Sequence, residues 1–261
     1  MRDAGHKKTI QKYYSHRAKD YDKQKSRTWK SERGFNDRVV DIITDITEGS
    51  TEKSILEVCV GSGRISSLLL KKYKSYLVGL DLSKEMLKLA KARMAISKDD
   101  VDLVLGDAEY LPFTNEAFDI LVCVSAMHYF TKPEHSLVEF RQVLREKGVF
   151  VYGDLSLHKS DNRGFLNALE KAISHTHKNY YKSSEIEKLL ENKGFRIFET
   201  ETVAYRKSLI ALIEDKAVYF GIKPEALNTY LQSASEHEKK LYSVNNNEVT
   251  LFYTIVKATK E

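Results

Sequence analysis

The chain has 261 residues and a formal net charge of +5, with 42% hydrophobic and 30% charged residues. This balance is globular and excludes a disordered, collagen-like or coiled-coil chain, and the length predicts one large domain or two small ones. Two cysteines cannot build a disulfide scaffold or a cysteine-based zinc site. No stretch approaches the roughly 18 apolar residues of a membrane span, and the polar N-terminus lacks the apolar segment of a signal peptide, so we expect a cytoplasmic protein.

Positive charge is concentrated at the N-terminus. Residues 1–33 contain 11 Lys or Arg against 4 Asp or Glu, which leaves a slightly acidic remainder. Two interpretations are open: a solvated helical face, or a basic arm that meets an anionic substrate, a membrane surface or nucleic acid. The acidic remainder disfavours nucleic acid as the partner, because modules that bind it carry a strongly basic face.

Short apolar runs alternate with helical patterns between residues 54 and 155. Five runs rich in β-branched residues are expected as strands: 54–60, 76–80, 101–105, 118–124 and 149–155. Stretches with apolar residues three and four apart are expected as helices: 64–73, 83–96 and 135–145, the last closed by Gly148. Strands and helices that alternate at this spacing predict a parallel sheet with helices on both faces.

The pattern changes after residue 155. Further helices are expected at 162–177, 183–192, 209–220 and 224–242, followed by a turn at 245–247. Residues 195–204 alternate like a strand with one wet face, and residues 248–257 form a last apolar strand. Two late strands around a helical segment predict an antiparallel edge on an otherwise parallel sheet.

Acidic and glycine residues follow the ends of the expected strands. The turn Gly61–Gly63 closes the first strand, Asp81 the second and Asp107 the third, and Ser125–His128 follow the fourth. In an open α/β sheet, ligands bind outside the carboxyl ends of the strands. A glycine turn lets a ligand approach the backbone, and an acid about 20 residues further on accepts hydrogen bonds from both ribose hydroxyls. Because Asp81 follows Gly61 by 20 residues, we expect an adenosine-type ligand.

These motifs resemble those of class I S-adenosylmethionine-dependent methyltransferases. Glu57–Gly63 resembles their first motif, E/D-x-G-x-G-x-G. Gly79–Ser83 resembles the second motif, whose acid holds the ribose, and Gly106–Glu109 resembles the third region, whose Asp binds the adenine amino group. Tyr13–Asp22 resembles the N-terminal segment of the ubiquinone/menaquinone C-methyltransferase-like subfamily, methyltransferase type 11.

The resemblance is dense over residues 10–155 and absent over about 205–245. It implies an α/β fold with a Rossmann-like, seven-stranded, mostly parallel sheet in the order 3-2-1-4-5-7-6, helices on both faces and helical lid insertions. A single methyltransferase domain would span residues 1–261, with residues 1–35 as a basic helical lid and residues 205–245 as a helical insertion between the last two strands. The implied cofactor is S-adenosyl-L-methionine, which leaves as S-adenosyl-L-homocysteine, without a metal.

The resemblance also implies which positions contact the cofactor: Tyr14, Tyr21, Glu57, Gly61, Ser62, Gly63, Asp81, Leu82, Met86, Asp107, Ala108 and Ser125. Two interpretations of the two tyrosines stay open, as core aromatics under the first helix or as part of a lid over the sulfonium. One departure is Cys59, which stands where the family has the first glycine of its first motif. Cys59 and Cys123 are both expected in mid-strand as inert core thiols, so the cofactor contact is altered rather than lost.

The expected methyl acceptor is a small or medium organic molecule, methylated on oxygen, nitrogen or carbon. Ser125–His128 stand where enzymes that methylate DNA bases or protein glutamine have N/D-P-P-Y/F. His128 is the candidate general base, and the alternative is a structural or substrate-packing histidine. No Cys or nearby carboxylate completes a metal site around His158, His175 and His177.

Other functional classes stay open at this stage. The basic N-terminal arm is compatible with a tRNA or protein methyltransferase, and a non-catalytic S-adenosylmethionine-binding protein would carry the same motifs. A Rossmann dehydrogenase is disfavoured because the third glycine of G-x-G-x-x-G is missing after Gly63. We expect a monomer or a homodimer.

Overall fold

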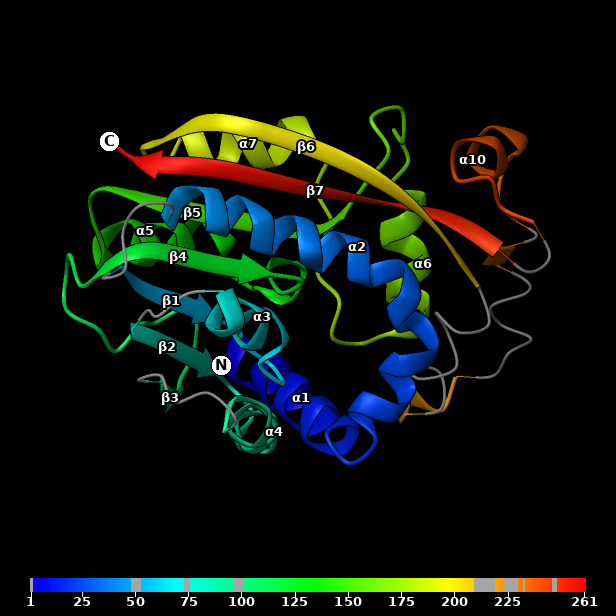
Figure 1. The fold of residues 1–261 in the computed structure, drawn as a ribbon. Helices are drawn as coiled ribbons and strands as arrows, with labels where there is room; N and C mark the ends of the chain where they lie inside the picture. Colours follow the sequence, from blue (N-terminus) through cyan, green and yellow to red (C-terminus); the bar gives the residue numbers. More distant parts are fainter. Residues whose placement is uncertain are drawn as a thin grey trace.

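The computed structural model describes residues 2–47, 53–72, 76–95, 101–208, 219–222, 230–231, 233–245 and 248–261. Its strands form one sheet in the order β3-β2-β1-β4-β5-β7-β6 (Figure 1). The strands are β1 (Ser54–Val58), β2 (Tyr76–Asp81), β3 (Val101–Leu105), β4 (Phe118–Val124), β5 (Leu144–Ser156), β6 (Phe195–Ser208) and β7 (Glu248–Lys260). The helices are α1 (Arg2–Arg17), α2 (Tyr21–Thr47), α3 (Arg64–Lys72), α4 (Lys84–Met94), the 3-10 turn η1 (Met127–Tyr129), α5 (Pro133–Val143), α6 (Phe165–Ile173), α7 (Ser183–Glu191) and α10 (Glu236–Leu241).

The strand pairing confirms the predicted topology. β1 lies at the centre of the parallel part, between β2 and β4, and β3 and β5 extend it on either side. β7 runs antiparallel to both β5 and β6. The carboxyl ends of β1 to β4 therefore meet at one edge, as the Rossmann-like order requires of a ligand site.

Helices cover both faces of the sheet. Phe35 of α2 and Ile65 of α3 belong to one cluster of buried apolar side chains. Phe140 of α5 and Ile186 of α7 belong to a second cluster. Figure 1 shows α2 crossing the near face of the sheet, with α5 and α7 behind it. The strands are thus buried from both sides, which explains their continuous apolar runs.

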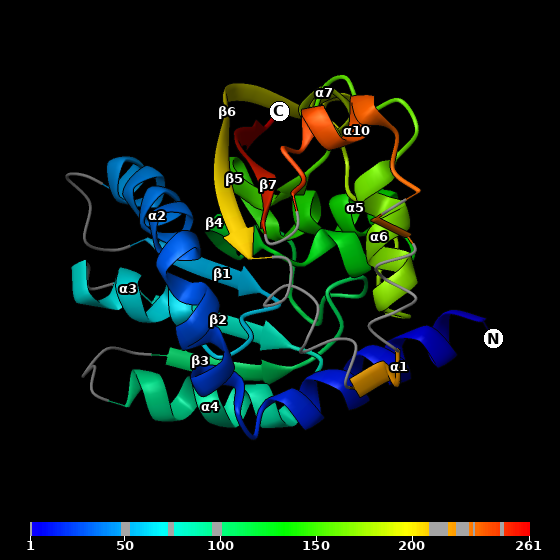
Figure 2. The same ribbon diagram turned by 90° about the vertical axis from the view of Figure 1, so that its right-hand side faces the viewer.

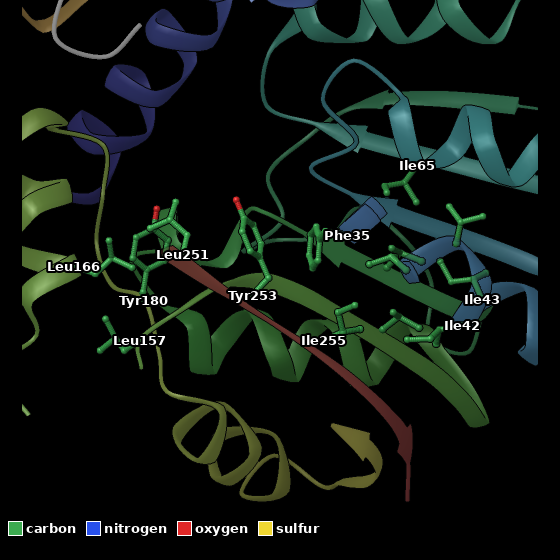
Figure 3. Packing of buried hydrophobic residues seen from close by; sticks show 14 of the residues in the cluster. Phe35, Ile42, Ile43, Ile65, Leu157, Leu166, Tyr180, Leu251, Tyr253 and Ile255 are labelled. Carbon is green, nitrogen blue, oxygen red and sulfur yellow. The ribbon is translucent and has the colours of Figure 1, made fainter. Parts of the chain in front are cut away.

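The second half of α2 is part of the core. The ring centroid of Phe35 lies 4.7 Å from that of Tyr253 in β7, and Ile42, Ile43 and Ile255 belong to the same cluster (Figure 3). A Cβ atom built on Gly153 of β5 would lie 3.0 Å from Cζ of Phe35. The glycine therefore makes room for this ring. Because α2 continues to Thr47, the second helix of the N-terminal segment also carries a face that packs on the core.

The predicted boundary between the third helix and the fifth strand is wrong. The helix expected at 135–145 ends at Val143, and β5 begins at Leu144, which pairs with Phe118 of β4. The left-handed residue of the following turn is Lys147, with φ of 61°, rather than Gly148. A Cβ on Gly148 would lie 2.8 Å from the carbonyl oxygen of Arg145, so Gly148 serves a close backbone approach. Strand pairing across the sheet thus overrides the local helical pattern.

The later elements follow the prediction with shifted ends. The helix expected at 162–177 is reduced to α6, because Gly164 adopts a left-handed φ of 69° at its start. The Asp161 carboxylate accepts backbone hydrogen bonds from Arg163, Gly164 and Phe165 there. Residues 209–218 of the helix expected at 209–220 and residues 224–229 of the helix expected at 224–242 lie outside the described residues, as does part of the 245–247 turn. The described end of the second helix corrects the prediction, because residues 233–235 interrupt it and only α10 (Glu236–Leu241) follows, capped by Ser235. Within the described ranges, no helix is both long and apolar enough to cross a membrane.

Candidate active site

A cavity opens at the carboxyl ends of β1 to β4. Its lining residues come from α1, from α2 and from the loops that follow the strands. Figure 2 shows α1 lying beside the carboxyl ends of the strands. The lining residues that the sequence analysis had singled out for the cofactor are Tyr14, Tyr21, Glu57, Gly61, Ser62, Asp81, Leu82, Asp107, Ala108 and Ser125. The predicted ligand edge of the sheet and the cavity therefore coincide.

Glu57 holds the first loop to the helix that follows it. Its carboxylate accepts hydrogen bonds from the backbone N–H of Ser66, at 3.0 Å, and from the Ser66 hydroxyl. Burial raises the pKa of Glu57 to about 8, against the two hydrogen bonds from Ser66, which lower it. The buried carboxyl thus fixes the end of β1 against α3, and the Gly61–Gly63 turn lies between them.

Asp81 joins two loops at the centre of the cavity. Its Oδ2 accepts from the backbone N–H of Gly61 and its Oδ1 from that of Ser83, both at 2.8 Å. Burial raises the pKa of Asp81 to about 6, and these backbone hydrogen bonds oppose the shift. Each carboxylate oxygen keeps a further lone pair, so the group can still accept hydrogen bonds from a ligand.

Gly61 shows why the loop needs a glycine. Its φ is 56°, in the left-handed region, and a Cβ there would meet no atom closer than 3.9 Å. The constraint is therefore the backbone conformation, and the space beside the glycine belongs to the cavity. A ligand group can approach this backbone closely, which fits the adenosine-type ligand expected from the sequence.

Asp107 and Glu109 meet a lysine from α1 at the end of β3. Lys7 Nζ lies 2.6 Å from Asp107 Oδ2 and 2.6 Å from Glu109 Oε2. Glu109 is buried and also accepts from the Thr131 hydroxyl and the backbone N–H of Lys132. Lys7 was not predicted from the sequence, because its partners are about 100 residues away in the chain.

One face of α1 carries the contacts to the cofactor edge. One helical turn after Lys7, Gln11 Nε2 donates to the carbonyl of Leu82 at 3.1 Å. Another turn further on, Tyr14 Oη donates to Tyr129 Oη at 2.8 Å, and Ser15 Oγ donates to Glu85 at 2.5 Å. These positions recur every three or four residues, so they share one side of the helix.

Aromatic side chains join α1 to a distant segment. The ring centroid of the buried Tyr13 lies 5.0 Å from that of Tyr219 and 5.2 Å from that of Phe220. The His16 ring lies 5.0 Å from Tyr219, and the His175 ring lies 5.2 Å from Phe220. Parts of the two segments that the sequence analysis assigned to lids are thus in contact with each other.

His128 forms a buried pair with Asp154 beside the cavity. The Nδ1 atom of His128 lies 2.8 and 2.9 Å from the two carboxylate oxygens of Asp154, and the residues are 6% and 2% exposed. The ring packs between Tyr129, at 3.9 Å between centroids, and Tyr180, at 5.0 Å. Asp154 was not predicted from the sequence, because the pairing of β5 with β4 is what brings it next to η1.

Three of the predicted site residues do not line the cavity in the described part of the chain: Gly63, Met86 and His128. A Cβ on Gly63 would lie 3.1 Å from Cα of Ala90, so this glycine lets α4 pack closely. Met86 is buried under the first turn of α4, where its backbone N–H donates to the Ser83 hydroxyl.

Several lining residues were not predicted for the cofactor: Lys7, Ile10, Asn36, Cys59, Val60, Arg64, Ile65, Gly106, Glu109, Val124, Ala126, Tyr129 and Phe130. The spacing of Lys7, Ile10 and Tyr14 was visible in the sequence as one helix face. Cys59 corrects an expectation, because it follows the end of β1 and is not within the strand. Its φ of 57° is left-handed, and its side chain lines the cavity.

The described residues contain no group of three or more His, Cys, Asp or Glu side chains placed to hold a metal ion.

Residues 56–152 match the methyltransferase domain family. The chain contains a class I S-adenosylmethionine-dependent methyltransferase domain. The matched stretch runs from β1 into β5 and so includes the strand ends that carry Asp81 and Asp107.

Known proteins similar to this methyltransferase domain include both curated relatives and solved structures. Phthiotriol/phenolphthiotriol dimycocerosates methyltransferase of Mycobacterium tuberculosis is 39% identical over 104 residues, which are 40% of this chain and 38% of that protein. The chain thus matches about two fifths of the length of that relative. Malonyl-(acyl-carrier protein) O-methyltransferase of Geobacter sulfurreducens is 25% identical over 175 residues, 64% of this chain and 65% of the relative. A solved Bacillus halodurans structure is 26% identical, with a TM-score of 0.75 over 85% of this chain and 98% of its own.

Proposed function

We propose that this protein transfers the methyl group of S-adenosyl-L-methionine to a small or medium organic acceptor. The acceptor's nucleophilic atom forms the new bond to the methyl carbon, the C–S bond breaks, and its electron pair stays on sulfur in S-adenosyl-L-homocysteine. The observation that carries the proposal is the cavity in which Gly61, Asp81 and Asp107 meet at the carboxyl ends of three adjacent strands.

This arrangement supports the proposed cofactor positions. Asp81, whose oxygens each receive one backbone hydrogen bond, accepts the ribose hydroxyls. Asp107 accepts the adenine amino group, as the resemblance to the family implies. The Gly61–Gly63 turn and the start of α3 face the methionine part, where backbone N–H groups favour a carboxylate. The sulfonium supplies the activated methyl, so the protein's task is to hold the acceptor in line and exclude water.

We assign the role of general base to His128 for acceptors that must lose a proton. Its Nδ1–H donates to Asp154, which fixes the ring and leaves Nε2 able to take the acceptor's proton. No described residue forms a hydrogen bond with Nε2. The name of the Geobacter sulfurreducens relative, an O-methyltransferase, supports oxygen as one of the acceptor atoms.

The position of α1 favours a small acceptor over a macromolecule. Lys7 and Tyr14 face the cavity and contact residues of its opposite wall. The part of the basic N-terminal segment that contacts the cofactor edge is thus turned inward. α1 and the aromatic side chains of residues 219–220 then form part of a roof that keeps water from the sulfonium.

A labelled-methyl screen against a metabolite extract tests the proposed function. We expect the wild-type protein to transfer label from S-adenosylmethionine to at least one extracted metabolite. Asp81→Ala should bind S-adenosylhomocysteine more weakly by about 1–3 kcal/mol, because it removes the acceptor for the ribose hydroxyls. Calorimetry measures this difference, and unchanged affinity would remove Asp81 from the site.

His128→Asn separates chemistry from cofactor binding in the same assay. It should retain affinity for S-adenosylhomocysteine, since His128 does not line the cofactor cavity, and should lose transfer to a protonated oxygen or nitrogen acceptor. If this variant transfers the methyl group as well as the wild type does, His128 is not the general base and its role is structural. Tight cofactor binding by the wild type with no labelled product in any extract would favour a non-catalytic binding protein.

A further inference from the structure

We propose that Lys7 is a positioning residue for the cofactor, which acts by orienting the Asp107 carboxylate toward the 6-amino group of adenine. The inference rests on the proposed cofactor site and adds to it a residue from outside the domain's sequence motifs. It makes recognition of the purine depend on α1, a helix that precedes the matched methyltransferase stretch.

Lys7 bridges two carboxylates at short range. Its Nζ lies 2.6 Å from an oxygen of Asp107 and 2.6 Å from an oxygen of Glu109, and its side chain is only 17% exposed. Nζ also lies 4.8 Å from the ring centroid of Tyr110. Burial lowers the pKa of Lys7, but its hydrogen bonds to the two acids outweigh this effect and raise it, so Lys7 is a cation here.

Glu109 is the fixed end of the bridge. The Thr131 hydroxyl lies 3.0 and 2.9 Å from its two oxygens, and the backbone N–H groups of Thr131 and Lys132 donate to the same carboxylate. The side chain is 3% exposed. Because Glu109 cannot turn without losing these bonds, Lys7 is held in one place when it contacts both acids.

Asp107 is the end that Lys7 orients. Its Oδ1 accepts from the backbone N–H of Glu109 at 3.0 Å, and its Oδ2 accepts from Lys7. The two contacts fix the plane of the carboxylate. Without Lys7, the backbone contact alone remains, and the like charges of Asp107 and Glu109 are no longer bridged by a cation.

A carboxylate distinguishes the substituent at the purine 6-position. It accepts a hydrogen bond from an amino group, whereas a 6-oxo group offers it only another acceptor. This discrimination depends on the carboxylate's orientation, since hydrogen bonds weaken steeply away from linear geometry. Lys7 should therefore strengthen the preference for adenine over hypoxanthine.

Calorimetry with S-adenosyl-L-homocysteine and its 6-oxo analogue, S-inosyl-L-homocysteine, tests the proposal. Lys7→Met keeps an unbranched side chain that is only one atom shorter and removes its charge. We expect this variant to lower the ratio of the two affinities on the order of tenfold relative to wild type, mainly by weakening the adenosine compound. Lys7→Arg, which preserves the charge and can bridge two carboxylates, should restore most of the ratio.

Gln11→Ala is the matched control for loosening of α1. It removes a neighbouring contact of the same helix face, to the carbonyl of Leu82, but leaves Asp107 untouched. This variant should weaken both compounds equally and keep their ratio. An unchanged ratio in Lys7→Met would overturn the role of Lys7 while the cofactor site stands. Failure of the wild type to bind either compound would overturn the proposed function itself.

Discussion

Cys59 shows how one residue departs from its family at a backbone position. Its φ of 57° places a side chain in the left-handed region, where L-residues other than glycine are strained by roughly 1–2 kcal/mol. Burial raises the pKa of its thiol well above the usual value near 9, so it is a neutral side chain on the cavity wall. The backbone strain and the room that the side chain takes up in the cavity both indicate that glycine, which the family has here, is the better residue for stability.

Cys59→Gly is therefore expected to stabilise the fold by up to about 1 kcal/mol, because relief of strain exceeds the added chain entropy of glycine. Denaturant unfolding measures the change. Cys123→Gly is the matched control, since Cys123 is 1% exposed within β4 and the same substitution there removes packing from a strand interior. It should be destabilising, and loss of stability in both variants would show that Cys59 is not strained.

At the scale of elements, α1 is joined to the strand ends by polar contacts of His6, Lys7, Gln11, Tyr14 and Ser15. Among its described side chains, only Tyr13 and Arg17 are buried. Segments with little apolar burial open at low free-energy cost. A cofactor bound as proposed would contact both α1 and the strand ends, so it should lower the population of the open state.

Hydrogen exchange with and without S-adenosylhomocysteine measures this closure. We expect residues 7–17 of α1 to gain protection when the compound is bound, because opening then also breaks contacts with the ligand. α7 serves as the internal reference, since it packs on β6 and β7 away from the cavity and should be unaffected. Equal protection of α1 in both states would make Tyr14 and Tyr21 ordinary packing residues.

The elements also show what could be predicted from the sequence. The strand ends at Asp81 and Asp107 were visible, because apolar runs and the residues that close them are local features. The end of α5 was not, because Leu144 leaves the helical pattern to pair with Phe118, 26 residues earlier. The contacts of Lys7 and the pairing of His128 with Asp154 join elements that are distant in the sequence, so no local sequence pattern predicts them.

At the scale of the whole molecule, α2 ties the N-terminal segment to the far edge of the sheet. Phe35 packs on Tyr253 of β7 (Figure 3). Its ring also lies against Gly153 of β5. The Arg38 side chain of the same helix lies 2.6 Å from Glu201 of β6. The helix that follows the proposed lid is thus packed on β5, β6 and β7. The same contacts stabilise this edge of the sheet and fix the helix to which the lid is attached.

The contact between Phe35 and Gly153 can be measured by a double-mutant cycle. Phe35→Ala should destabilise the fold by about 3–5 kcal/mol, because it empties a buried site. Gly153→Ala should also be destabilising, because its Cβ would lie 3.0 Å from the Phe35 ring. In the double variant the new methyl enters the emptied space, so the combined loss of stability should fall short of the sum of the two single losses by about 0.5–3 kcal/mol.

Gly5→Ala in α1, where a Cβ meets nothing within 4 Å, controls for glycine replacement and should not be destabilising. If the losses of stability in Phe35→Ala and Gly153→Ala are strictly additive in denaturant unfolding, the glycine at position 153 is not there to make room for the Phe35 ring.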